Sequence, residues 1–189
     1  GAVGTLVSSL VDFATPAGQV DNVTDPDTGA QLGIAVTAAD TANGNWYYST
    51  NNGTNWNALG AVANNNARLL AADANTRLYF QPNDNYNGTL SNAITFRAWD
   101  QTSGTNGALA DTTSNGGTTA FSTATDSASL TINPVNDAPV LGPIGNQTVD
   151  ELVTLTFTAT ATDSDLPADI LTFSLDAASM ALGMSIDAN

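Results

Sequence analysis

Residues 133–140 contain two prolines, Pro134 and Pro139, and separate two apolar runs of the chain. Before them, residues 128–132 alternate small or polar side chains with branched apolar ones, which is the period of a half-buried strand. After them, Val140 and Leu141 begin another apolar run. Each proline fixes its own φ and favours an extended conformation in the residue before it. The sequence therefore predicts two β regions joined by a short, stiff connector.

The polar side chains of this connector are Asn133, Asn136 and Asp137. All three carry oxygen atoms of the kind that a hard cation such as Ca²⁺ prefers. Asn and Asp also favour turns, so an ordinary proline-containing linker with a turn at Asn136 and Asp137 is an alternative that the spacing leaves open.

Composition points to an all-β protein. The 189 residues include 17 Asp but one Glu, three Arg, and no Lys or His, whereas Thr, Asn, Ser, Gly and Val are abundant. Charged helix formers are therefore scarce, and residues typical of strands and turns dominate.

Residues 1–133 are predicted to form one antiparallel sandwich. Five Asn-Gly pairs, typical of hairpin turns, punctuate its apolar runs. The predicted strands cover residues 32–38, 46–49, 67–72, 77–80, 93–99 and about 127–132. Residues 1–13 have mixed periodicity and fit either a strand or one or two helical turns.

After the connector, the alternation predicts further strands at 149–160 and 170–175. Three or so strands are too few to close a second sandwich. We therefore expect residues 140–189 to be the N-terminal part of a second domain, and the chain to be a fragment of a longer protein.

The net charge of −15 excludes several classes of partner. There is no basic patch to neutralise nucleic acid phosphates or anionic lipid. No segment approaches the roughly 20 apolar residues of a transmembrane helix, so we expect no membrane insertion. Without His, Cys, Lys or a G-x-S-x-G motif, the sequence favours a protein that is not an enzyme. Multivalent cations are the expected compensation for so much negative charge.

Two short acidic phrases recur, V-T-D-P-D at 23–27 and A-T-D-S-D at 161–165. Each D-x-D can present two carboxylates from one turn to a cation. An EF-hand would need Glu at position 12, where Val36 and Ser174 stand instead. The alternative is that these Asp residues simply form turns without metal.

These phrases, with F-Q-P at 80–82, Y-N-G at 86–88, R-A-W-D at 97–100 and N-P-V-N-D-A-P-V at 133–140, resemble the cadherin-like repeats of giant secreted bacterial adhesins of the RTX type. The resemblance implies Greek-key, Ig-like β-sandwiches in tandem with Ca²⁺ at their junctions. It implies a first domain at 1–133 that lacks its first strand, a calcium-site linker at 134–139, and an incomplete second domain at 140–189.

The resemblance also implies the calcium ligands. Asp25, Asp27 and Asp100 are expected to cluster at the N-terminal pole of the first domain. Glu151 matches a Glu that, in domains of this family, lies near the first strand and faces the next junction. The ligands expected at the central junction are Asn133, Asn136, Asp137, Asp163 and Asp165.

The leading hypothesis is a structural extender repeat of an exported adhesin or filament, located outside the cell or on the bacterial surface. Its expected partners are neighbouring repeats and other copies of the chain that complete open sheet edges. Covalent completion by a longer polypeptide is the competing account. A carbohydrate-binding module is the alternative function, with a surface glycan stacked on Trp46, Tyr47, Tyr48, Trp56 or Trp99. Burial of these aromatic residues in a core is the favoured interpretation.

Overall fold

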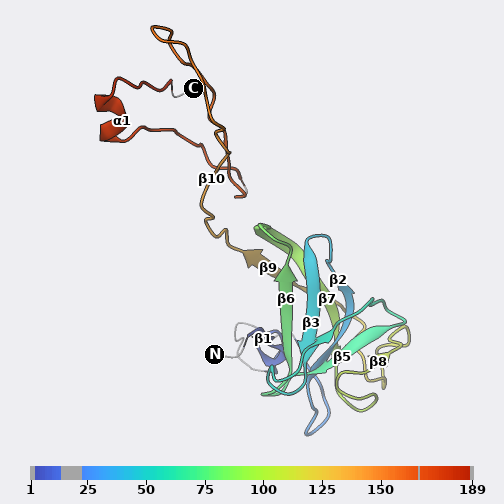
Figure 1. Ribbon diagram of the computed structural model, residues 1–189. Helices are drawn as coiled ribbons and strands as arrows, with labels where there is room; N and C mark the ends of the chain where they lie inside the picture. Colours follow the sequence, from blue (N-terminus) through green and yellow to red (C-terminus); the bar gives the residue numbers. More distant parts are fainter. Residues whose placement is uncertain (1–2, 14–22, 166, 188–189) are drawn as a thin grey trace. The chain divides into compact units, whose positions relative to one another are not determined.

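The computed structural model describes residues 3–13, 23–165 and 167–187, and the chain divides into two compact units, 1–132 and 133–189 (Figure 1). All named strand pairs are antiparallel, so the all-β prediction is confirmed. No helix among the described residues is long and apolar enough to cross a bilayer.

The described residues of the first unit form two sheets, of which the smaller has the strand order β1-β6-β3-β4. Its strands are β1 (Thr5–Leu6), β3 (Gly44–Ser49), β4 (Asn57–Ala58) and β6 (Arg77–Pro82). The β3–β4 hairpin turns at Asn52 and Gly53, which have φ values of 57° and 84°. Asn and Gly tolerate this left-handed conformation best, which explains the Asn-Gly signal at this turn.

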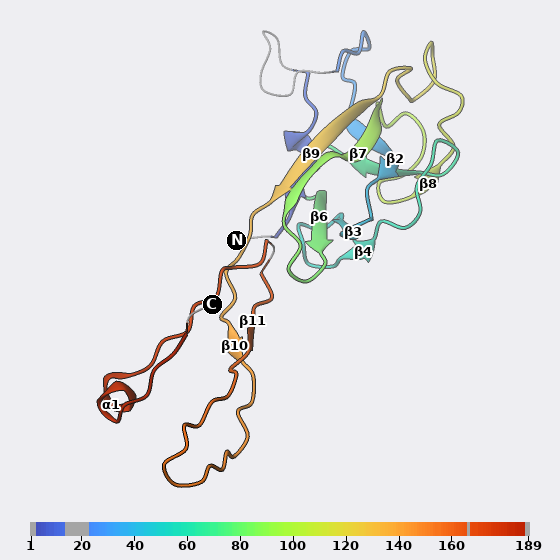
Figure 2. The same ribbon diagram turned by 90° about the horizontal axis from the view of Figure 1, so that it is seen from above.

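The larger sheet has the order β8-β5-β2-β7-β9 (Figure 2). Its strands are β2 (Gly33–Ala39), β5 (Ala67–Ala71), β7 (Gly88–Trp99), β8 (Leu109–Ala110) and β9 (Asp126–Ile132). The long pair β7–β9 shifts register between Leu90 and Ile94, where the ladder is irregular. The strands predicted for this unit from alternation are therefore confirmed. Residues 1–13 contain both β1 and a 3-10 turn, η1 (Val7–Ser9).

The two sheets share one hydrophobic core. Trp46, Leu78 and Phe80 enter it from the smaller sheet, and Ile34 and Phe96 enter it from the larger sheet. Since Trp46 is only 8% exposed and packs at 5.0 Å from Phe80, it belongs to the core.

A second apolar cluster lies on the other face of the larger sheet. Ala35, Leu69 and Trp99 form it with Ala120 and Phe121 from the long segment that follows β7. Trp99 is 1% exposed, and its indole N–H donates to the carbonyl of Ser103 at 2.7 Å. Both faces of β2 are thus covered, which explains why five successive residues of this strand are buried instead of alternating.

The three arginines all lie on strands of the first unit and donate to backbone carbonyls. Arg68 bonds the carbonyls of Leu59 and Gly107 and lies 4.9 Å from the ring centroid of Tyr48. Arg77 bonds the carbonyl of Gly4, and Arg97 bonds that of Ser122. Each guanidinium therefore fastens a loop or terminal segment to a strand.

The described residues of the second unit have little regular structure. They contain β10 (Val140–Leu141), β11 (Ala161–Thr162) and the single-turn helix α1 (Ala177–Ala181). Asp176 caps α1 by accepting from the backbone N–H of Ser179, and this hydrogen bond lowers the pKa of its carboxyl.

The predicted strands at 149–160 and 170–175 are wrong, since the described structure contains no strand in either range. Alternation gives a strand only where a neighbouring strand accepts its hydrogen bonds. In this unit β10 and β11 supply two paired residues each. Several large apolar residues of these ranges are correspondingly exposed, with Phe157 at 45% and Ile170 at 95%, whereas Leu171, Phe173 and Leu175 are half-buried.

Candidate metal centre

Three carboxylates gather in the loop after β11. Asp163, Asp165 and Asp169 each offer an oxygen, and these oxygens lie within 4.8 Å of one another. Asp163 and Asp165 are half-buried, and Asp169 is exposed. The backbone N–H of Asp165 donates to Oδ1 of Asp163 at 2.9 Å, which folds the D-x-D phrase into a tight turn. Among the described residues, this is where three acidic side chains come close enough to hold one ion.

The connector reaches this loop through Asp137. Its backbone N–H donates to both carboxylate oxygens of Asp165, at 2.9 and 3.2 Å, and its side chain accepts from Ser164 Oγ at 3.1 Å. The register of the β10–β11 ladder explains why Asp137 and Asp165 come together. Val140 pairs with Thr162 in the β10–β11 ladder, so residues three positions outside this pair, Asp137 and Asp165, stand opposite each other.

The electrostatics of the loop favour a cation. Two unit charges about 4 Å apart repel by about 1 kcal/mol even in water, and three carboxylates give three such pairs. Residues 133–189 contain eight acidic side chains and no basic one, so no Lys or Arg of this unit can relieve the repulsion. Oxygen ligands from carboxylates are the preference of Ca²⁺.

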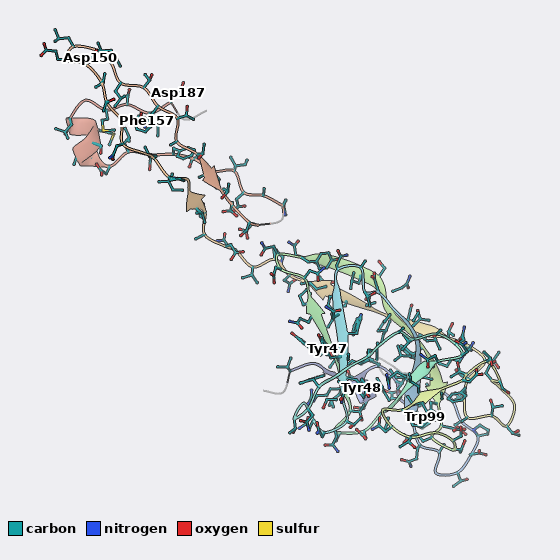
Figure 3. The ribbon with its side chains drawn as sticks, turned by 45° about the vertical axis from the view of Figure 1, so that its right-hand side comes forward. Tyr47, Tyr48, Trp99, Asp150, Phe157 and Asp187 are labelled. Atoms are coloured by element: carbon teal, nitrogen blue, oxygen red, sulfur yellow. The ribbon has the colours of Figure 1, made fainter. Side chains whose placement is uncertain are left out.

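The other predicted ligands of the second unit lie apart from this group or only flank it. Asn136 donates its side-chain amide to the carbonyl of Asp137 at 2.7 Å, whereas Asn133 is exposed directly after β9. Glu151 lies outside the triad, in the turn that begins at Asp150. Figure 3 shows Asp150 at the opposite end of the second unit from β10 and β11.

The acidic residues predicted for the first unit line one cavity. Asp25, Asp27 and Asp100 border a volume of about 460 Å³, together with Trp99 and Phe121. One oxygen of Asp25 accepts from the backbone N–H of Asp27 at 2.9 Å, and one of Asp100 accepts from Thr102 N at 2.8 Å. The three carboxylates do not form a group as close as that of Asp163, Asp165 and Asp169. An ion here would need further ligands from the cavity wall or from water.

Asp169 is the functional candidate that the sequence analysis missed. Its signal is the spacing D-S-D-L-P-A-D over residues 163–169, in which a proline returns the chain towards the first two carboxylates. Asp169 stands directly before the strand predicted at 170–175 and was given no role from the sequence.

Comparisons with protein-family models, with curated proteins and with solved structures find no match to this chain.

Proposed function

We propose that this chain is a structural extender repeat of an exported bacterial adhesin or filament, built from Greek-key, cadherin-like sandwiches and rigidified by Ca²⁺ where one domain follows another. The observation that carries the proposal is the hydrogen bond between the connector, at Asp137, and the carboxylate of Asp165 in the triad. An ion held by Asp163, Asp165 and Asp169 fixes the connector as well as the loop.

In the proposed mechanism, a bound cation relieves the repulsion between the carboxylates and thereby stiffens the loop and the connector. Without the ion, the three carboxylates repel one another and the connector is held by hydrogen bonds from Asp137 and Ser164. Asp163, Asp165 and Asp169 would hold the ion, and its coordination would oppose opening of the loop. The extracellular location and the absence of enzymatic activity belong to the same proposal.

Calcium binding to the triad is tested by isothermal titration calorimetry on the whole chain. Three carboxylates with several water ligands predict a dissociation constant of about 10⁻⁴–10⁻³ M, the range of extracellular calcium modules. At a hundredfold excess over that constant, binding stabilises the folded state by about 2.7 kcal/mol. Asp163→Asn and Asp169→Asn each remove a ligand charge and are expected to weaken binding about tenfold or more.

The matched control is Asp150→Asn, which removes the same charge from the same unit at its other end. It is expected to leave the calorimetric titration unchanged. If Asp150→Asn and Asp163→Asn lost the same calcium affinity, the effect would come from overall charge, and a defined site would be contradicted. Absence of any calcium heat would contradict the proposal.

The first-unit cavity has its own readout, because Trp99 lines it with Asp25, Asp27 and Asp100. Residues 133–189 contain no tryptophan, so indole fluorescence reports the first unit alone. A calcium-dependent change in fluorescence that Asp100→Asn abolishes would assign a second ion to this cavity. An unchanged spectrum would restrict calcium to the triad.

A further inference from the structure

The outer face of the smaller sheet carries a row of aromatic rings. Along β3 and β6, Trp46, Leu78 and Phe80 face the core, so the alternating positions Tyr47 and Tyr79 face outwards. Tyr47 and Tyr79 are directly opposite in the β3–β6 ladder, with ring centroids 6.3 Å apart and planes inclined by 32°. Both side chains are half-buried. The two rings form a gently twisted platform on a paired sheet.

Trp56 extends this row across the sheet. It precedes β4, yet its ring lies 5.6 Å from that of Tyr79 on β6. It also reaches Gly4 beside β1, where a Cβ atom would lie 2.8 Å from the indole. Gly4 has a φ of 83°, which glycine adopts without strain. The third ring is inclined by 57° to that of Tyr79 and is held against the backbone at Gly4, so it supports Tyr79 from the side before any ligand arrives.

The platform has uncharged hydrogen-bonding groups at one end. Asn45 and Gln81 form the next outward pair of the ladder, and both are exposed. Each amide side chain offers two N–H donors and a carbonyl acceptor. At the other end stands Arg77, whose guanidinium donates to Gly4 O and Asn52 Oδ1. Neither β3 nor β6 contains an acidic residue, although the whole chain carries a net charge of −15.

A hollow adjoins the platform beside Tyr47. It has a volume of about 180 Å³ and is lined by Tyr47 and Asn45 together with Thr41, Ala58 and Gly60. A cavity of about 150 Å³ accepts a benzene molecule, so this hollow has the size for one six-membered ring. An aromatic ring and an amide therefore meet at the rim of this small hollow.

We propose that this face, formed by Tyr47, Tyr79 and Trp56 with the amides of Asn45 and Gln81, binds an uncharged glycan. The C–H faces of pyranose rings stack on the tyrosines, and sugar hydroxyls exchange hydrogen bonds with the two amides. The strongly acidic chain disfavours acidic polysaccharides, and the amides that flank the rings suit hydroxyl groups better than an apolar protein surface. This site lies in the first unit and requires none of the proposed calcium ligands.

Affinity electrophoresis of the native chain tests the proposal. The gels contain a soluble β-glucan, a galactomannan or a dextran as uncharged probes, and alginate as the acidic probe. At least one uncharged polysaccharide is expected to retard the chain, and alginate is not. Tyr47→Ala and Tyr79→Ala each remove a stacking ring and are expected to weaken retardation about tenfold.

The controls separate binding from folding and from calcium. Asn45→Ala combined with Gln81→Ala changes only exposed side chains and is expected to weaken retardation in a chain that melts as the wild type does. Leu109→Ala, exposed on β8 of the other sheet, is expected to leave it unchanged. Retardation is also expected to persist in a chelator. Three results would each overturn the proposal: no retardation by any of the three uncharged polysaccharides, undiminished retardation of Tyr47→Ala, or equal retardation by alginate.

Discussion

At the scale of single residues, Asn106 links the two sheets of the first unit. Its Oδ1 accepts from the buried N–H of Ala71 on β5 at 3.0 Å, and its amide donates to the fully buried Thr76 beside β6 at 2.8 Å. Asn106→Ala leaves both buried groups without this partner. A buried unsatisfied group costs about 1–3 kcal/mol, so the free energy of unfolding is expected to fall by at least that amount. Urea unfolding followed by tryptophan fluorescence measures it.

Asn55→Ala is the matched control for this substitution, because Asn55 is an exposed asparagine of the same unit. Exposed substitutions usually change stability by less than about 0.5 kcal/mol. Similar losses in the two variants would show that the Asn106 bonds contribute nothing specific.

At the scale of elements, β2 is the central strand of the larger sheet, and its first residue, Gly33, has no room for a side chain. A Cβ atom at Gly33 would lie 2.7 Å from the carbonyl oxygen of Leu70 on β5 and 2.7 Å from the indole of Trp99 on β7. The first of these atoms is backbone, so the strands themselves must separate. Gly33→Ala is expected to cost about 1–3 kcal/mol by overpacking.

Ala38→Val provides the comparison on the same strand, since Ala38 is exposed and a branched residue suits a strand. Its urea midpoint is expected to stay close to that of the wild type. A Gly33→Ala variant as stable as Ala38→Val would mean that the sheet accommodates the methyl group without moving.

The sequence predicted correctly those features that depend on residues close together in the chain, and it failed for features that depend on distant residues. The strands of the first unit were predictable because alternation and Asn-Gly turns are encoded within a few residues of each other. Residues 149–160 carry the same alternation but pair with no strand in the described structure, and pairing depends on distant residues. The carboxylate of Asp169 and the platform position of Tyr79 were missed because both depend on how the chain returns in space.

At the scale of the whole molecule, net charge and exposed apolar side chains have opposite effects on self-association. The second unit exposes Phe157 and Ile170, while the net charge of −15 keeps copies apart. Added salt shortens the Debye length from about 10 Å at 0.1 M to about 3 Å at 1 M. We therefore expect sedimentation velocity to show reversible self-association that increases with salt and with protein concentration.

Phe157→Ser and Ile170→Ser are expected to suppress this association, and Leu109→Ser, on an exposed site of the first unit, is expected to have little effect. A monomer at every salt and protein concentration would argue against other copies of the chain as partners.

The placement of the three arginines determines how susceptible this molecule is to a trypsin-like protease. Such enzymes cut after Lys or Arg, and the sequence has no Lys. Arg68, Arg77 and Arg97 lie within β5, β6 and β7, so every cleavable bond is part of a hydrogen-bonded strand or its edge. Cleavage then requires opening of the first unit. The second unit can open and close without offering such an enzyme a single bond to cut.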